Sequence, residues 1–185
     1  MSISPLHEAV RRIVISGSIR EDSASQFLEQ ITALEYIDAS KIVTIYIDTY
    51  GGNVDAAMLI YDAMRICSCP IRTVGIGKVM SAGSLILAAG DPGNRFLTKN
   101  TRVMIHQISG GAIGPLADME NELQEMGRLQ DQYASVLATH VNKSKTQIMS
   151  DLKSDKYMTA TEAIKYGLAD KVLPFCTKKV PRKKK

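Results

Sequence analysis

The sequence predicts an α/β fold. Short runs rich in β-branched residues alternate with segments of helical periodicity, and this alternation is typical of a parallel sheet with right-handed crossovers. The length of 185 residues suits one domain that buries about 70% of its unfolded surface. Hydrophobic residues make up 45% of the chain and charged residues 23%, which are values of a globular rather than a disordered protein.

Four runs are predicted to form strands because they are short, apolar and rich in valine and isoleucine. They span residues 12–16 (RIVIS), 42–47 (IVTIYI), 71–76 (IRTVGI) and 102–106 (RVMIH). The second run is apolar almost throughout, which indicates a fully buried strand.

Helices are predicted between these strands because residues that typically cap a helix N-terminus occur there. Three pairs of residues have the spacing of a capping box, in which two residues bond each other's backbone reciprocally. The pairs are Ser23 with Gln26, Ser144 with Gln147, and Thr159 with Glu162. Asn53 is expected to cap a helix over residues 54–67, which Pro70 prevents from running much further.

The longest predicted helix runs from Pro115 to about Val141. Its apolar residues recur at steps of three and four and form one apolar face. They are Leu116, Met119, Leu123, Met126, Leu129, Tyr133 and Leu137. Glycines precede it, and a helix of this length is less typical of a compact core. We therefore expect it to project and to pack against another subunit.

The basic charge of the chain comes from its C-terminus. Residues 177–185 (TKKVPRKKK) carry six basic residues and no acidic one, so the formal net charge of +4 becomes −2 without them. We expect this segment to be a disordered, solvated tail. Because the rest of the chain is slightly acidic, the fold itself is not a nucleic-acid-binding surface, and nucleic acid is not an expected partner.

Cysteine usage and apolar patterning indicate a reduced, cytoplasmic protein. Cys67 and Cys69 are too close for a metal pair and awkwardly spaced for a disulfide, and Cys176 leaves the set odd. The N-terminus lacks the apolar region of a secretory signal. The longest apolar stretch, 79–89, is too short to span a bilayer, so no membrane partner is expected.

Glycine-rich turns follow apolar strands but predict no nucleotide site. They lie at 51–52, 75–77 and 110–111, and none has the spacing of a phosphate loop or a dinucleotide fingerprint. We expect neither a cofactor nor a metal.

Ser81 is the first candidate for catalysis. In the segment GKVMSAGSLILAAG it follows a strand and opens an apolar helix rich in small residues. Free backbone N–H groups at a helix N-terminus favour developing negative charge, and small residues let a substrate approach closely. The alternative is that Ser81 only caps a buried helix.

His106 is the second candidate. It ends the strand RVMIH before the glycine-rich stretch QISGGAIG, a position suited to a general base, although a structural histidine is the alternative. A carboxylate would have to orient its ring. Asp155, expected in a turn between two short helices, is a plausible choice among 19 acidic residues. His140 ends the long helix, where contact with the helix dipole explains it.

Four stretches carry a resemblance to a known family. They are IYIDTYGGNVDAAMLIYDAM, GIGKVMSAGSLILAAG, TRVMIHQISGG and SDKYMTATEAIKYGLADKV. In their residues, order and spacing, from about residue 12 to 172, the chain resembles ClpP, the proteolytic subunit of the Clp protease. The resemblance implies the crotonase-related fold of repeated ββα units with a projecting handle helix, here about 115–141. It divides the chain into a short N-terminal segment (1–11), a peptidase domain (12–176) and the tail (177–185).

The resemblance also implies residue roles. Ser81 takes the nucleophile position, His106 that of the general base and Asp155 that of the carboxylate that orients the imidazole. The family's oxyanion hole consists of backbone N–H groups, which here match Gly52 and Ala82. The substrate is expected to bind as an added strand. The residues expected to flank it are Gly52, Asn53, Val54, Gly110, Gly111 and Ala112.

Function and assembly follow from the same resemblance. It implies a self-compartmentalising serine endopeptidase that cleaves peptides and unfolded proteins through an acyl-enzyme, with a core that itself needs no ATP. The handle helix would interlock two stacked seven-membered rings, so a homo-oligomer is expected. Family members engage an ATP-dependent unfoldase with the help of N-terminal axial loops. Only 11 residues precede Arg12, so we expect that partnership to be weaker, altered or absent.

The sequence departs from the family pattern at several positions, none of which removes a catalytic group. Tyr50 and Ile108 stand where prolines are usual, Ala82 where methionine is common, and Ser154 where many members have an arginine. Three alternatives remain open. They are a catalytically silent structural ring subunit, a specialised processing peptidase that works without an unfoldase, and an acyl-CoA-processing enzyme of the related crotonase fold.

Overall fold

The structure is a computed structural model that describes residues 11–175. The predicted basic tail, Cys176 and residues 1–10 of the predicted N-terminal segment lie outside this range. Among the described residues, no helix is both long enough and apolar enough to cross a membrane.

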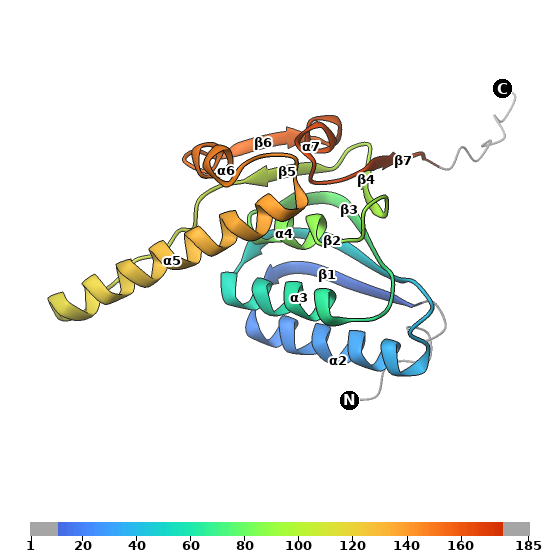
Figure 1. Cartoon of the computed structure of the whole chain (residues 1–185), viewed down its shortest axis with the longest axis horizontal. Helices are drawn as coiled ribbons and strands as arrows, with labels where there is room; N and C mark the ends of the chain where they lie inside the picture. Colours follow the sequence, from blue (N-terminus) through green and yellow to red (C-terminus); the bar gives the residue numbers. More distant parts are fainter. Residues whose placement is uncertain (1–10, 176–185) are drawn as a thin grey trace, which may run out of the picture.

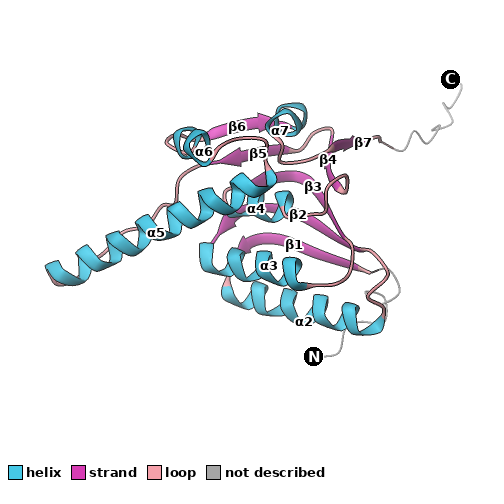
Figure 2. Cartoon of the chain, in the orientation of Figure 1, coloured by secondary structure: helices cyan, strands magenta, loops and turns pink. Residues whose placement is uncertain are grey.

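Strands and helices alternate along the chain, so the predicted α/β class is confirmed (Figure 1, Figure 2). All four predicted strands are present, and the first three extend beyond their expected ends. The elements are β1 (Arg12–Ile19), α2 (Glu21–Ile37), β2 (Val43–Gly52), α3 (Val54–Ile66), β3 (Ile71–Met80), α4 (Ala82–Ala88), β4 (Arg95–Thr98), β5 (Arg102–Ile105), α5 (Leu116–His140), α6 (Lys145–Asp151), β6 (Lys156–Thr159), α7 (Ala160–Tyr166) and β7 (Lys171–Leu173).

A single sheet joins the strands of residues 11–175. Strands β1, β2, β3, β4 and β7 lie in that order and run parallel. Strand β3 is shared between two neighbours, because residues 73–75 pair with β4 whereas residues 78–80 pair with β5. Strand β5 pairs in turn with β6, antiparallel. The carboxyl ends of β3 and β5 therefore lie next to each other, and Ser81 and His106 follow them directly.

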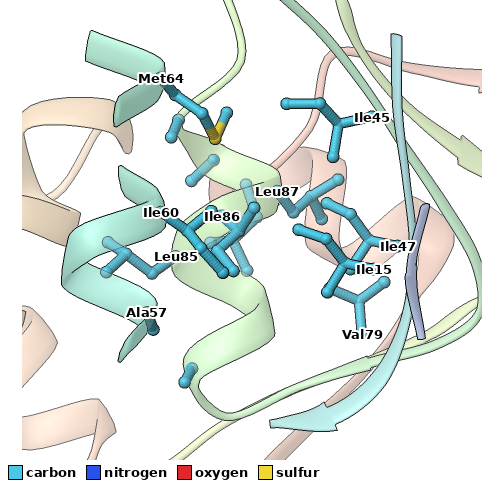
Figure 3. Close-up of a cluster of buried hydrophobic side chains, with 14 of the residues drawn as sticks. Ile15, Ile45, Ile47, Ala57, Ile60, Met64, Val79, Leu85, Ile86 and Leu87 are labelled. Atoms are coloured by element: carbon cyan, nitrogen blue, oxygen red, sulfur yellow. The ribbon is translucent and has the colours of Figure 1, made fainter. Parts of the chain in front are cut away.

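The core lies between the sheet and the helices that cover it. Helix α4 is buried over its whole length and lies between α3 and the strands (Figure 3). Ile60 of α3, Leu85 and Leu87 of α4, and Ile47 of β2 are all fully buried. Burying a side chain of this kind contributes about 1.5–3 kcal/mol. The turn that carries Ser81 is thus attached directly to the centre of the core.

The second predicted strand, β2, is buried on one face only. Ile45, Ile47 and Thr49 are fully buried, whereas the residues between them are partly exposed. Tyr46 faces this open side, where the guanidinium of Arg12 lies 5.9 Å from the centre of its ring. The expectation of a fully buried strand was wrong because α4 covers one face of β2, whereas Thr44, Tyr46 and Asp48 on the other face remain partly exposed.

Three of the four predicted helix starts are confirmed. Asn53 caps α3, since its Oδ1 accepts a hydrogen bond from the Ala56 N–H at 2.8 Å. Ser144 and Thr159 form the predicted capping boxes of α6 and α7.

Helix α2 begins earlier than predicted, so Ser23 is not its cap. The cap residue is Arg20, and Ser23 lies in the first turn, where its Oγ accepts the Arg20 N–H at 2.9 Å. Glu21 and Asp22 precede it in that turn, and acidic side chains are favourable near a helix N-terminus. This stabilisation explains the earlier start.

The long predicted helix is confirmed as α5. Its C-terminal half is anchored, because Tyr133, Ala134 and Leu137 are buried against the domain. Its N-terminal half extends away from the sheet (Figure 1). There, Leu116 and Leu123 are 68% and 59% exposed. Part of the apolar face of this half therefore stays uncovered within the described chain.

Candidate active site

Ser81 occupies the turn between β3 and α4. Its backbone has φ 53° and ψ −127°, a conformation that non-glycine residues rarely adopt. The Ser81 N–H donates to the carbonyl of Met104 in β5 at 2.8 Å, which ties the turn to the neighbouring strand. Its side chain makes no capping hydrogen bond to α4. The alternative of a plain helix cap therefore does not account for Ser81.

His106 lies beside Ser81. It directly follows β5, whose Met104 pairs in parallel with Met80, the residue before Ser81. Nε2 of the imidazole is 2.8 Å from the Ser81 Oγ. The side chain is about a quarter exposed (25%), so the ring is reached from solvent at one edge.

Asp155 lies on the other side of the imidazole. In the antiparallel ladder of β5 and β6, Ile105 pairs with Lys156, and one further step places His106 opposite Asp155. The Asp155 Oδ1 is 3.4 Å from the His106 Nδ1, and the carboxylate is 54% exposed. Asp155 was expected between two short helices, but it lies between α6 and a strand, β6. That strand supplies the register that brings the carboxylate to the histidine.

The paired glycines at the end of β2 pack against the serine turn. A Cβ atom at Gly51 would lie 2.7 Å from the Ser81 Cβ, and one at Gly52 would lie 2.1 Å from the Ile19 carbonyl oxygen. Both glycines have positive φ. Thr49 holds this turn, since its Oγ1 accepts the Gly51 N–H at 2.9 Å. Only glycine permits so close an approach.

A small pocket of about 40 Å³ opens beside Ser81. Its walls come from the ends of β2, β3 and β5, from the start of α3 and from α5. The lining residues are Gly52, Val54, Ser81, Ala82, His106, Gln107, Ile108, Ser109 and Tyr133.

The residues expected to flank a substrate are only partly gathered at this pocket. Gly52 and Val54 line it, whereas the Asn53 side chain is engaged as the cap of α3. Gly110, Gly111 and Ala112 follow the pocket residue Ser109 in a stretch without regular secondary structure. Gly110 approaches α5, since a Cβ there would lie 2.9 Å from the Met126 Cε.

Comparison with known proteins agrees with this geometry. The family model described as Clp protease matches residues 3–175. The chain belongs to the Clp protease family. It is also 37% identical over 166 residues to the ATP-dependent Clp protease proteolytic subunit 1 of Thermobifida fusca (strain YX). That alignment covers 89% of this chain and 75% of the relative.

Membership of the Clp protease family confirms the family resemblance and the predicted class of enzyme, a serine protease. In general terms, the family also implies oligomeric assembly and partnership with Clp ATPases.

Sequence reasoning missed two residues beside the turn that carries Ser81, namely Tyr133 and Ser84. Tyr133 was recognised only as part of the apolar face of α5, yet its hydroxyl lies 3.0 Å from the Ser84 Oγ. The Ser84 Oγ donates to the carbonyl of Ser81 at 2.6 Å. The only signal was that a tyrosine occupies a buried position on an otherwise aliphatic face, where its hydroxyl needs a partner.

His140 does not act through the helix dipole as expected. Its Nε2 lies 3.0 Å from the Tyr61 hydroxyl. Burial, helped by the positive charges of Arg65 and Arg95, lowers the pKa of His140 to about 4. The ring is therefore neutral near pH 7, and a neutral ring gains little from the helix dipole.

Other potential reactive groups are not built for catalysis. Burial raises the pKa of the Cys67 thiol to about 11, so it is not a thiolate near neutral pH. Cys69 is buried, and its Sγ accepts a hydrogen bond from Arg11. Over residues 11–175, no group of three or more His, Cys, Asp or Glu side chains is arranged to hold a metal ion.

Proposed function

We propose that this protein is a serine endopeptidase in which Ser81 is the nucleophile, His106 the general base and Asp155 the carboxylate that orients the imidazole. The observation that carries the proposal is the 2.8 Å contact between the Ser81 Oγ and the His106 Nε2, with Asp155 on the opposite ring nitrogen. This contact favours an active subunit over a catalytically silent one.

The proposed reaction begins with proton transfer. With its proton on Nδ1, facing Asp155, the His106 ring can accept the Ser81 hydroxyl proton at Nε2 as Oγ attacks the peptide carbonyl carbon. His106 then gives this proton to the leaving amine as the peptide C–N bond breaks. The acyl-enzyme ester is hydrolysed by a water molecule that His106 deprotonates in the same way.

The developing oxyanion would be stabilised by the backbone N–H groups of Gly52 and Ala82. The two segments are in contact, since a Cβ at Gly51 would lie 3.1 Å from the Ala82 nitrogen. Removing one such donor typically costs about 3–4 kcal/mol of transition-state stabilisation.

The substrate would bind as an extended strand between the segments 52–54 and 110–112. Backbone groups would supply most contacts, so many sequences would be accepted. The pocket beside Ser81 would receive the side chain next to the cleaved bond. Its small volume favours small groups there.

The projecting half of α5 supports the proposal of an enclosed assembly. An exposed apolar helix face gains free energy when a second copy covers it. We propose that α5 is the handle that interlocks two stacked seven-membered rings of this chain, which places Ser81 inside a chamber.

Labelling with a fluorophosphonate probe tests the proposed nucleophile. The Ser81 Oγ would attack phosphorus and release fluoride, so the assembled protein would be labelled. Ser81→Ala and His106→Ala would abolish labelling and peptide cleavage. Ser150→Ala is the matched control, because Ser150 is an exposed serine on α6. Labelling that survives in Ser81→Ala, or none in the assembled wild-type protein, would defeat the proposal.

A further inference from the structure

The carbonyl of Ser81 points into the core and is held there by Ser84. The Ser84 N–H donates to this oxygen at 2.9 Å, and the Ser84 Oγ donates to it at 2.6 Å. Ser84 is fully buried. Ser84 thus donates two hydrogen bonds to the Ser81 carbonyl oxygen, one from its backbone and one from its side chain.

Tyr133 completes this arrangement from α5. Its hydroxyl lies 3.0 Å from the Ser84 Oγ and 3.4 Å from the Ser81 carbonyl oxygen. A serine hydroxyl has one proton, and that of Ser84 is directed at Ser81. The Ser84 Oγ can then accept the proton of Tyr133, which gives a chain from Tyr133 through Ser84 to Ser81, beside the longer direct contact of Tyr133 with the Ser81 carbonyl.

The chain remains in this direction under assay conditions. Tyr133 is only 3% exposed. Burial raises the pKa of Tyr133 to about 12, although its hydrogen bond with Ser84 opposes the shift. The phenol therefore keeps its proton and remains a donor at neutral pH.

The carbonyl of Ser81 and the N–H of Ala82 belong to one peptide unit. This unit is planar and trans, so the C=O and N–H bonds point in opposite directions. Ser81 has an unfavourable positive φ, and such a conformation persists only where the surroundings hold it. Whatever holds the carbonyl in the core therefore also fixes the direction of the Ala82 N–H.

We propose that Ser84 and Tyr133 are positioning residues for catalysis: by holding the Ser81 carbonyl, they aim the Ala82 N–H at the oxyanion of the tetrahedral intermediate. This inference rests on the function proposed above. Ser84 acts on the peptide unit through two hydrogen bonds, and Tyr133 acts mainly through Ser84, with one longer contact of its own to the Ser81 carbonyl. Neither side chain exchanges a proton with the substrate.

The test compares Ser84→Ala, Tyr133→Phe and the double variant, assayed as the assembled protein with one fluorogenic peptide amide. Tyr61→Phe is the matched control, because it removes another tyrosine hydroxyl that bonds to α5, at His140. Active sites are counted with the fluorophosphonate, so that kcat refers only to folded subunits.

We expect Ser84→Ala to lower kcat about 10- to 100-fold with KM changed less than about twofold, since only a transition-state contact is lost. Tyr133→Phe should lower kcat about 3- to 10-fold, and the double variant should be no worse than Ser84→Ala, because residues of one chain are not additive. Tyr61→Phe should match the wild type.

Inhibitor binding separates positioning from general damage to the pocket. The aldehyde of the test peptide forms a tetrahedral adduct with an oxyanion, whereas the corresponding alcohol does not. Affinity for the aldehyde should fall by the same factor as kcat/KM in each variant, while affinity for the alcohol stays constant. This comparison can be made on Tyr133→Phe alone, which keeps the ring, if Ser84→Ala does not fold.

Three results would overturn the inference: wild-type kcat in folded Ser84→Ala or Tyr133→Phe, losses that multiply in the double variant, or equal weakening of aldehyde and alcohol. Ser81→Ala is assayed in parallel. If Ser81→Ala retains activity, the proposed function itself fails. If Ser81→Ala is inactive and the positioning variants behave as wild type, only the present inference fails.

Discussion

His106 Nε2 lies 2.8 Å from Ser81 Oγ, although 25 positions separate the two residues along the chain. The contact arises because β3 and β5 are adjacent and parallel, and each residue follows the end of its strand. Sheet pairing thus places a hydroxyl and an imidazole in hydrogen-bonding contact.

Asp155→Asn should lower kcat for peptide cleavage by about 10²- to 10⁴-fold, less than Ser81→Ala or His106→Ala. The reason is that Asp155 orients the imidazole but is half exposed, and its Oδ1 lies 3.4 Å from Nδ1. Steady-state kinetics would decide this. Asp118→Asn is the control, because Asp118 is exposed on α5. Asp151→Asn is unsuitable, because the Asp151 carboxylate accepts hydrogen bonds from Lys156 and Tyr166. A loss in Asp155→Asn equal to that in Ser81→Ala would contradict the orienting role.

Gly52→Ala should abolish cleavage and lower the free energy of unfolding by more than about 1 kcal/mol. A Cβ there would lie 2.1 Å from the Ile19 carbonyl oxygen, and the residue has φ 153°. Gly127→Ala is the control, since no atom lies within 4 Å of a Cβ built at that exposed position of α5. Thermal unfolding measures the loss of stability, and a peptide-cleavage assay measures the loss of activity. An active, stable Gly52→Ala protein would rule out the close packing of Gly52 against the backbone of Ile19.

Stability should fall between about pH 6.5 and pH 4, and His140 should account for part of the loss. Its pKa is about 4 in the folded protein, whereas an unfolded histidine titrates near 6.5. Below pH 6.5 the unfolded state therefore binds a proton that the folded state does not, and unfolding becomes more favourable. His140→Gln should flatten the dependence of the melting temperature on pH in this window. An unchanged slope would show that His140 is not held neutral.

Leu123→Glu should reduce the size of the assembled particle without unfolding the subunit. Leu123 is 59% exposed in the single chain, so a charge costs little there, but it would be buried unpaired if α5 packs on a second copy. Gln124→Glu is the control with the same change of charge on the same helix. Sedimentation velocity would measure the size of the assembled particle. Identical profiles for the two variants would argue against the handle role of α5.

Several elements could not be predicted from the sequence because they depend on distant partners. Strands β4, β6 and β7 are three or four residues long and contain charged residues, so they have little pattern of their own. They form because β3, β5 and β4 offer unpaired edges. The same dependence explains the half-open face of β2, which only its neighbours could reveal.

What the sequence by itself determined is local. Helix caps at Asn53, Ser144 and Thr159, the periodicity of α5 and the glycine turn at the end of β2 all depend on residues within a few positions of one another. Ser81 and His106 could be singled out because each ends a strand beside small residues. The choice of Asp155 among the acidic residues rested on family resemblance.

Only the tertiary structure decided which side chains meet. The register of β5 with β6 places Asp155 opposite His106, and the packing of α5 on α4 directs the hydroxyl of Tyr133 toward Ser84. The physical reason is that strand pairing and helix packing join residues far apart in the chain, and no local pattern encodes the partner. Local chemistry supplied the groups of the proposed active site, and non-local pairing brought them together.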